Sequence, residues 1–169
     1  MKLRYSIALS LPLTSASAMG ADLALKIDVP QLNVAEYHRP YIAAWIENAD
    51  QKVVANLAVL YDTKKKDNGG SKWLKDMRQW WRKTGRDVEM PMDGVSGATK
   101  APGEHTLSAP KAALDKLPAG QYTVLVEVAR EAGGREVVKV PLQWPPKSAQ
   151  NVSGQGKEEV GAVVVQLKP

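Results

Sequence analysis

The sequence contains no cysteine and no phenylalanine, and only two histidines among its 169 residues. Without cysteine the chain has no disulfide, thiolate metal site, iron–sulfur cluster, cysteine nucleophile or lipidated cysteine anchor. Two histidines also argue against a multi-histidine metal site. Aromatic residues reach only 6%, so Val, Leu, Ile and Ala must fill most of the core. The hydrophobic content of 44% and the charged content of 24% are nevertheless typical of a folded domain.

The N-terminus has the pattern of a secretory signal peptide. Lys2 and Arg4 precede an apolar stretch over residues 5–13, which is too short to span a bilayer as a permanent helix. Ala16-Ser17-Ala18 then supplies a small-x-small cleavage site. We therefore expect a signal peptide at residues 1–18, or up to residue 20, and a periplasmic location. The alternative interpretation is a buried N-terminal helix.

Cleavage also changes the charge. Loss of Lys2 and Arg4 leaves 21 basic and 18 acidic residues, so the formal charge falls from +5 to +3. This weakens the case for a polyanionic partner. We expect a protein that is neither a nucleic-acid binder nor an integral membrane protein.

Most of the remaining chain has the patterning of β-strands. Apolar residues alternate or run together in six segments, Leu23–Val29, Tyr41–Asn48, Val53–Tyr61, Gln121–Arg130, Arg135–Trp144 and Val160–Leu167. Gly133-Gly134 between two of these predicts a hairpin, and Pro141 predicts an edge strand or a bulge. Strands and helices do not alternate in the βαβ manner of a parallel sheet, which favours one antiparallel, immunoglobulin-like β-sandwich over residues 22–169. Residues 150–158 are expected to form an exposed loop.

One segment has a helical pattern instead. Five apolar residues fall on one face of an amphipathic helix over about residues 71–84, and they are Trp73, Leu74, Met77, Trp80 and Trp81. Ser71 is the expected N-cap and Gly85 the residue after the C-terminus. The simpler interpretation is that this face packs on the sandwich. The alternative is that Trp73, Trp80 or Trp81 stays near the surface to contact a ligand. Lys64-Lys65-Lys66 just upstream is expected to be a loop tip.

Residues 86–110 have little regular patterning and are expected to form a long loop. This loop contains Asp93-Gly94-Val95-Ser96-Gly97-Ala98-Thr99. By residue type alone this is a tight, exposed turn, because its two glycines and short polar side chains favour unusual backbone angles. Its glycine spacing fits neither a dinucleotide-binding loop nor a P-loop.

The same seven residues resemble the acceptor motif for covalent FMN, Asp-x-x-Ser/Thr-Gly-Ala-Ser/Thr, which bacterial flavin transferases modify with FAD as donor. The resemblance implies that Thr99 carries FMN through a phosphodiester and that Asp93, Ser96, Gly97 and Ala98 complete the recognised site. Asp93 would contact the transferase or its metal. With no cysteine and few histidines in the chain, an attached FMN is the one candidate that we have for electron chemistry.

A wider resemblance covers most of the mature chain. It rests on residues 40–48, residues 72–82 and the heptapeptide followed by residues 101–104. These blocks are similar to a bacterial periplasmic family of unknown function that is proposed to include flavin-transferase substrates. Relatives often occur with a flavin transferase and with PepSY-type membrane proteins thought to pass electrons across the inner membrane. The resemblance therefore implies an electron carrier with a membrane-bound redox partner.

Two other hypotheses compete with this one. The chain could be a non-redox binding module for an envelope protein or a polysaccharide, with an exposed Trp as its platform. It could also be a hydrolase that uses Ser96 or Thr99, which requires His105 or His38 as a base. Beside a flavin, His105 could instead assist proton uptake.

Overall fold

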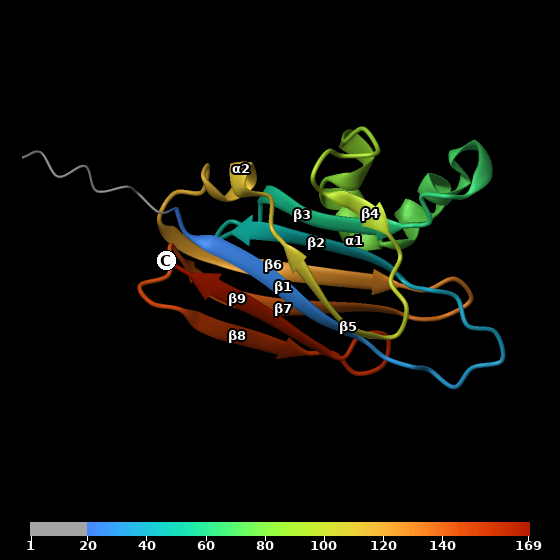
Figure 1. Ribbon diagram of the computed structural model, residues 1–169. Coiled ribbons are helices and arrows are strands. Elements are labelled where there is room, and N and C mark those ends of the chain that lie inside the picture. The colour runs from blue at the N-terminus through green and yellow to red at the C-terminus, as the bar shows by residue number, and fades with distance from the viewer. Residues whose placement is uncertain (1–19) are drawn as a thin grey trace, which may run out of the picture.

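The computed structural model describes residues 20–169, which fold into a β-sandwich of two sheets (Figure 1). The four-stranded sheet has the order β5-β1-β9-β8, and these strands are Gly103–Ser108, Asp22–Val29, Ala162–Lys168 and Gln150–Gln155. The five-stranded sheet has the order β4-β3-β2-β6-β7, and these strands are Ser96–Ala98, Val53–Tyr61, Tyr41–Asn48, Gly120–Ala129 and Arg135–Trp144. The predicted mainly β sandwich is confirmed. The predicted signal peptide lies outside the described residues.

The inner core lies between the two sheets. Alternate residues of β1 are buried, and Leu25 and Ile27 are each 1% exposed. Val163 and Val165 of β9 lie beside them, and β6 contributes alternate residues from the other sheet. The short helix α2, Lys111–Leu114, adds Leu114 to this core. Here the period-two pattern predicted the buried face correctly.

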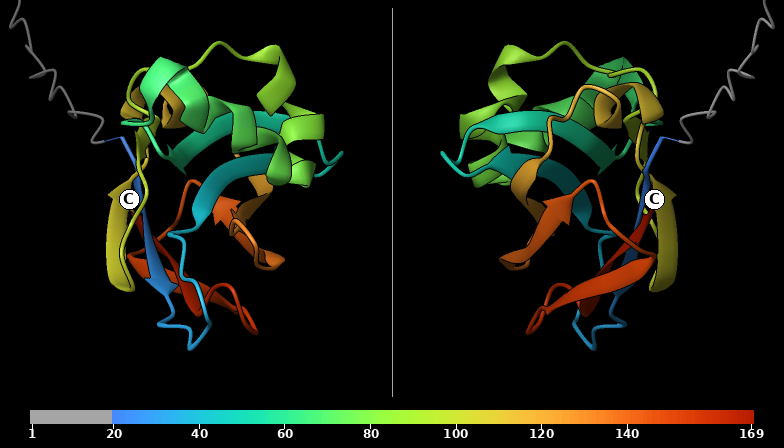
Figure 2. Two further views of the ribbon diagram at one scale, coloured as in Figure 1. Left: turned by 90° about the vertical axis from the view of Figure 1, so that its right-hand side faces the viewer. Right: turned by 90° about the vertical axis from the view of Figure 1, so that its left-hand side faces the viewer.

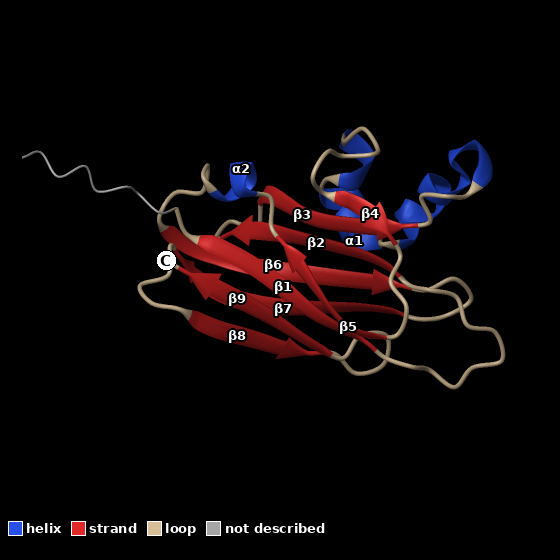
Figure 3. Cartoon of the chain, in the orientation of Figure 1, coloured by secondary structure: helices blue, strands red, loops and turns tan. Residues whose placement is uncertain are grey.

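The five-stranded sheet is apolar on its outer face as well. Residues 42–47 of β2 are all buried, on both faces of the strand. Ala43 and Trp45 belong to a second core that includes Leu74, Met77 and Trp80. A helical cover supplies these three residues, and it consists of the 3-10 segment η1 (Lys66–Asp76), the helix α1 (Arg78–Lys83) and the 3-10 turn η2 (Gly85–Asp87). Figures 2 and 3 show this cover on the outside of the sandwich.

The predicted helix over residues 71–84 is therefore wrong in its continuity, although its apolar face packs as expected. The helical structure breaks at Met77, where φ is −77° and ψ is 73°. Ser71 is not an N-cap but lies inside η1, and its hydroxyl donates a hydrogen bond to the Asn68 carbonyl at 2.8 Å. Gly85 does follow the helix, and it packs against Trp80. A Cβ at Gly85 would lie 2.5 Å from the indole ring.

A buried carboxylate accounts for the break. Glu127 on β6 is fully buried and accepts hydrogen bonds from the backbone N–H groups of Gln79, at 3.0 Å, and Trp80, at 2.7 Å. In a continuous helix these two groups would bond to the carbonyls four residues earlier. Arg135 donates to the same carboxylate at 2.7 Å. The side chain of Glu127 thus satisfies the first turn of α1 and fixes the cover to the sheet.

The predicted loops are also corrected. Residues 150–158 contain β8, and residues 86–110 contain β4 and β5. The strands β5 and β8 are the two edges of the four-stranded sheet, and each buries little of its surface. Their sequences are largely polar, so they lack the hydrophobic alternation that predicts a strand. Pro141 does lie on an edge strand, since β7 ends the five-stranded sheet as predicted.

Two carboxylates join the sheets near β7. Glu136 on β7 accepts hydrogen bonds from the backbone N–H groups of residues 157–160, which connect β8 to β9. Glu159 in that connection forms a two-point ion pair with Arg130, with N···O distances of 2.9 and 3.0 Å. Both side chains of the ion pair are at least nine-tenths buried. The β8–β9 connection is therefore held to the opposite sheet.

Replacement of Glu127 tests the anchoring of the cover. Glu127→Ala leaves two backbone N–H groups and Arg135 without their acceptor, and we expect a loss of about 3 kcal/mol in the free energy of unfolding. Glu127→Gln keeps one acceptor oxygen, so its free energy of unfolding should lie between those of Glu127→Ala and the wild type. Urea unfolding measures both. The exposed Glu131 is the matched control, and Glu131→Ala should change stability by less than about 0.5 kcal/mol.

Acidification tests the link through Glu136. Burial acts to raise the pKa of Glu136, but its four backbone hydrogen bonds outweigh burial and lower that pKa below its ordinary value. The ionised carboxylate therefore stabilises the fold above its unfolded-state pKa, and this contribution is lost as the pH falls through the lower, folded-state pKa. Between about pH 6 and pH 3 the wild type should lose more stability than Glu136→Gln in urea unfolding. Equal losses would contradict the assignment.

Candidate functional site

The heptapeptide Asp93–Thr99 forms an edge strand and its turn. Within it β4 pairs in parallel with β3, so that Leu60 lies beside Gly97 and Tyr61 beside Ala98. The pairing extends beyond the strand at both ends. Val59 donates its N–H to the Val95 carbonyl at 2.9 Å, and Thr99 donates its N–H to the Tyr61 carbonyl at 3.2 Å. The motif is thus an ordered part of the five-stranded sheet, and the expectation of a long loop was wrong here.

Two motif residues form the turn that precedes the strand. Gly94 has a positive φ of 67°, a conformation that glycine adopts at little cost. Ser96 donates its backbone N–H to the Met92 carbonyl, and its hydroxyl accepts the Met92 N–H, both at 2.9 Å. The hydroxyl of Ser96 therefore has a role within the fold.

Gly97 also has an internal role. A Cβ built on Gly97 would lie 3.0 Å from Cδ2 of Leu60, whose side chain belongs to the inner core. A larger residue at position 97 would have to displace Leu60 or move β4 away from β3. Packing within the chain thus accounts for glycine at this position.

Val95 packs against the second core, whereas Asp93, Ala98 and Thr99 are not packed in either core. Asp93 and Ala98 are exposed and Thr99 is half-buried. Among residues 20–169, no hydrogen bond or ion pair involves the side chain of Asp93 or Thr99. The fold explains Gly94, Ser96 and Gly97, whereas it gives no reason for an aspartate at 93, an alanine at 98 or a hydroxyl at 99.

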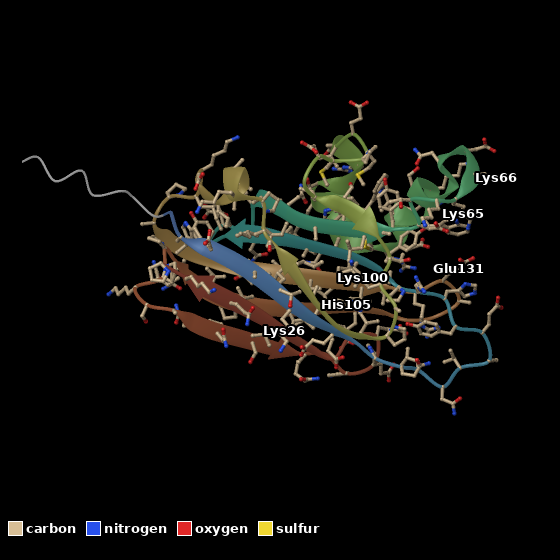
Figure 4. The ribbon with its side chains drawn as sticks, viewed as in Figure 1. Lys26, Lys65, Lys66, Lys100, His105 and Glu131 are labelled. Atoms are coloured by element: carbon tan, nitrogen blue, oxygen red, sulfur yellow. The ribbon has the colours of Figure 1, made fainter. Side chains whose placement is uncertain are left out.

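Thr99 lines an open pocket of about 420 Å³, which we name the Thr99 pocket. It lies at the end of the five-stranded sheet where β2 begins and where β3, β4 and β6 end. Its lining consists of three tyrosines, four basic residues, two acidic residues and three small ones, which are Tyr37, Tyr41, Tyr61, His38, Arg39, Lys64, Lys65, Asp62, Glu131, Thr63, Ala98 and Thr99. Figure 4 shows Lys65 and Glu131 at this end of the molecule. The volume is in the usual range for small-molecule sites.

The tyrosines form an aromatic wall on this pocket. The rings of Tyr41 and Tyr61 meet edge to face, with centroids 6.4 Å apart. Burial raises the pKa of Tyr41, whose hydroxyl donates to the Gly70 carbonyl at 3.1 Å. Gly70 in turn approaches the Asp62 backbone so closely that no Cβ fits there. These contacts hold the wall against η1.

Tyr37 has an unusual environment. Its hydroxyl is buried and, among residues 20–169, is the one buried side-chain polar atom without a hydrogen-bond partner. Burial is the main cause that raises the pKa of Tyr37. An unpaired buried hydroxyl costs about 1 to 3 kcal/mol. The lining of the pocket therefore contains a polar group whose hydrogen bonding is incomplete.

The charged residues of the pocket are basic on balance. Arg39, Lys64 and Lys65 are exposed and outnumber Asp62 and Glu131. His38 lies between two carboxylates, with ring nitrogens 3.2 Å from Glu36 and 3.8 Å from Glu131. An open, basic pocket favours an anionic ligand.

The two histidines do not meet the motif hydroxyls. His105 lies on β5 in the other sheet, and its Nε2 is 2.7 Å from the Ala101 carbonyl oxygen. His38 lines the Thr99 pocket but contacts carboxylates. Among the described residues neither histidine bonds to Ser96 or Thr99. The hydrolytic hypothesis thus lacks the base that it requires.

The tryptophans differ in exposure. Trp80 is fully buried and its indole N–H donates to Asn56 at 2.9 Å, which confirms packing as its role. Trp81 is half-buried and packs against the second core, on the outer face of the five-stranded sheet. Trp73 is 41% exposed, and the Lys65 ammonium lies 5.7 Å from its ring centroid. Of these three tryptophans, Trp73 is therefore the candidate for a surface platform.

The sequence patterns do not predict the Thr99 pocket. Its residues come from the segment before β2 and from Lys64 and Lys65, which were expected to form a loop tip. One usable signal existed, because the hairpin of β2 and β3 pairs Ile42 with Leu60 and so brings Tyr41 beside Tyr61. Tyr37, His38 and Arg39 reach the pocket only through the path that residues 30–40 take in the folded chain.

These observations define a β-sandwich with an edge-strand motif beside a basic, aromatic pocket. The chain belongs to the family described as "Predicted periplasmic protein (DUF2271)", whose model matches residues 22–162. No curated protein and no solved structure matches the chain. None of the helices within residues 20–169 is long and apolar enough to cross a membrane.

The different roles of Gly97 and Ala98 can be measured. Gly97→Val places an isopropyl group against Leu60, and we expect a loss of about 1 to 3 kcal/mol in the free energy of unfolding measured in urea. Ala98→Val, on an exposed position of the same strand, should cost less than about 0.5 kcal/mol. Equal costs at the two positions would show that Leu60 does not set the size limit at 97.

Proposed function

We propose that the chain is a periplasmic flavoprotein electron carrier in which FMN is attached to Thr99 through a phosphodiester. The observation that carries this proposal is the position of Thr99, a half-buried residue at the end of an edge strand that lines a basic, aromatic pocket. Among residues 20–169, the side chains of Asp93, Ala98 and Thr99 make no hydrogen bond or ion pair, so the fold does not explain these residue types. Recognition by a second protein explains why these residue types are present.

The attachment reaction requires only a hydroxyl from this chain. A flavin transferase supplies FAD and a base. The bond from Thr99 Oγ1 to the FMN phosphorus forms as the bond from that phosphorus to AMP breaks. The hydroxyl proton passes to the transferase base and AMP leaves. Because no hydrogen bond within residues 20–169 holds the Thr99 hydroxyl, it does not have to be released from these residues first.

The residues of the Thr99 pocket fit a bound FMN. Arg39, Lys64 and Lys65 offer positive charge to a phosphodiester, and the half-buried ring of Tyr41, which packs on the buried Tyr61, offers an aromatic surface to a flat ring. The incomplete hydrogen bonding of Tyr37 is consistent with a pocket that is finished by a ligand. A bound flavin supplies one- and two-electron transfer. The basic residues around it would favour its reduced, more negative form.

The partners in this proposal are proteins. A flavin transferase modifies the chain, a membrane-bound protein such as a PepSY-type reductase supplies electrons, and another redox protein accepts them. Covalent attachment keeps the flavin with the protein in a compartment from which a dissociating cofactor would be lost.

Mass spectrometry tests the proposal. The full chain is co-expressed with a flavin transferase, and the Thr99-containing peptide should gain the mass of FMN less one water. Thr99→Ala should abolish the gain, whereas Thr99→Ser, which keeps a hydroxyl that the motif permits, should retain it. A wild-type peptide with no added mass, or an added mass that survives Thr99→Ala, overturns the proposal.

The exposed Trp73 favours one second candidate, a non-redox module that binds an envelope protein or a polysaccharide. It predicts that the purified chain stays colourless after co-expression. It also predicts that Trp73→Ala reduces retention on immobilised peptidoglycan or polysaccharide, while the conservative Trp73→Phe keeps most of it. Binding that is unaffected by both substitutions contradicts this candidate.

A further inference from the structure

The open edge of β4 is a further feature of the site. In the five-stranded sheet β4 is the terminal strand, and its one neighbour is β3. The edges formed by β7 and β5 carry Pro141 and Glu104, which are residue types that discourage pairing with another strand, whereas the edge formed by β8 has neither a proline nor a charge. The strand β4 consists of Ser96, Gly97 and Ala98 and has neither a proline nor a charge.

The hydrogen bonds on both sides of β4 define which backbone groups are free. The Val95 carbonyl and the Thr99 N–H point at β3. Since alternate residues of a strand direct their backbone groups to opposite sides, Gly97 also faces β3, and Ser96 and Ala98 face the open edge. The Ser96 N–H is used by the turn at Met92. The N–H and C=O of Ala98 and the C=O of Ser96 therefore remain for an external partner.

We propose that the flavin transferase recognises this chain by strand addition: an extended segment of the transferase pairs with the open edge of β4 and so aligns the Thr99 hydroxyl with bound FAD. This inference rests on the proposed function of Thr99. Main-chain pairing at a sheet edge gives affinity that does not depend on large side chains. It therefore suits a strand whose side chains are a serine used in a turn, a glycine and an alanine.

The small side chains of β4 fit this mode of recognition. Ala98 is exposed, and its methyl group leaves space for another backbone at a normal strand spacing of about 4.8 Å. The edge is held in place before the partner arrives, since Gly97 packs on Leu60 and Thr99 bonds to Tyr61. Pairing would then cost little ordering of this chain.

A proline at position 98 tests the pairing. Ala98→Pro removes the outward N–H but none of the groups that bond β4 to β3. Under conditions where the transferase and FAD modify the wild-type chain, we expect the initial rate for Ala98→Pro to fall about tenfold or more. Ala98→Ser is the paired variant, because it changes the side chain but keeps the N–H, and its rate should fall clearly less than the rate for Ala98→Pro. Urea unfolding of both variants shows whether the fold is retained.

Hydrogen exchange gives a second readout that does not depend on the proline variant. Thr99→Ala lacks the acceptor hydroxyl, so its complex with the transferase is not consumed by the reaction. In this variant the Ala98 amide should exchange fast when the chain is alone and slow down in the complex, whose formation is checked by co-elution with the transferase and FAD. The Gly97 amide faces β3 and should be slow in both samples.

The outcomes separate the two proposals. No FMN mass on the wild-type chain overturns the proposed function. A modified wild type with an undiminished rate for Ala98→Pro, or an Ala98 amide that stays fast in the complex, overturns strand addition alone. If Ala98→Ser loses as much rate as Ala98→Pro, the side chain rather than the backbone is recognised, and strand addition is again overturned.

Discussion

The five-stranded sheet must be covered on both faces, and this constraint organises the rest of the structure. A strand such as β2, in which residues 42–47 are all buried, would expose Ala43 and Trp45 if only the second sheet packed on it. Exposing that much apolar surface is unfavourable by roughly 25 cal/mol for each Å². The helical cover removes this surface from water, and its two ends bring Lys65 and the turn before β4 to the edge of the sheet.

Attachment of the cover depends on polar contacts as well as on burial. Glu127 faces the cover from the middle of an apolar surface, and its carboxylate is satisfied by two backbone N–H groups and by Arg135. A second carboxylate, Glu47, accepts from the Trp45 indole and pairs with Lys83 at 2.9 Å. Both buried acids lie under α1. They fix the orientation of a segment whose hydrophobic contacts alone would permit sliding.

The sequence was sufficient to predict the strands that are buried on at least one face. The observed β2, β3 and β7 begin and end at the predicted residues, because dense apolar patterning and clear turn residues delimit them. It was insufficient for β5 and β8, which are polar edge strands, and for the break at Met77. That break is set by Glu127, 50 residues away along the chain, and no local pattern contains this information. The pocket was missed for the same reason, since its lining comes from four separate segments.

The local sequence explains only part of the structure of the motif, and its contacts with β3 explain the rest. As a sequence it predicted a flexible loop, because glycine, alanine and serine are common in turns. In the structure β3 holds the same residues as a strand, and Gly97 is small because Leu60 lies beneath it. The acceptor that we propose therefore differs from one on a free loop. The backbone of Thr99 is held by its bond to Tyr61, the strand has a paired edge on one side and an open edge on the other, and the pocket that would receive the attached group is already formed. A covalent tether on an ordered strand restricts where its ligand can lie, and this restriction matters for an electron carrier because the rate of transfer depends on the distance between the ligand and its partner.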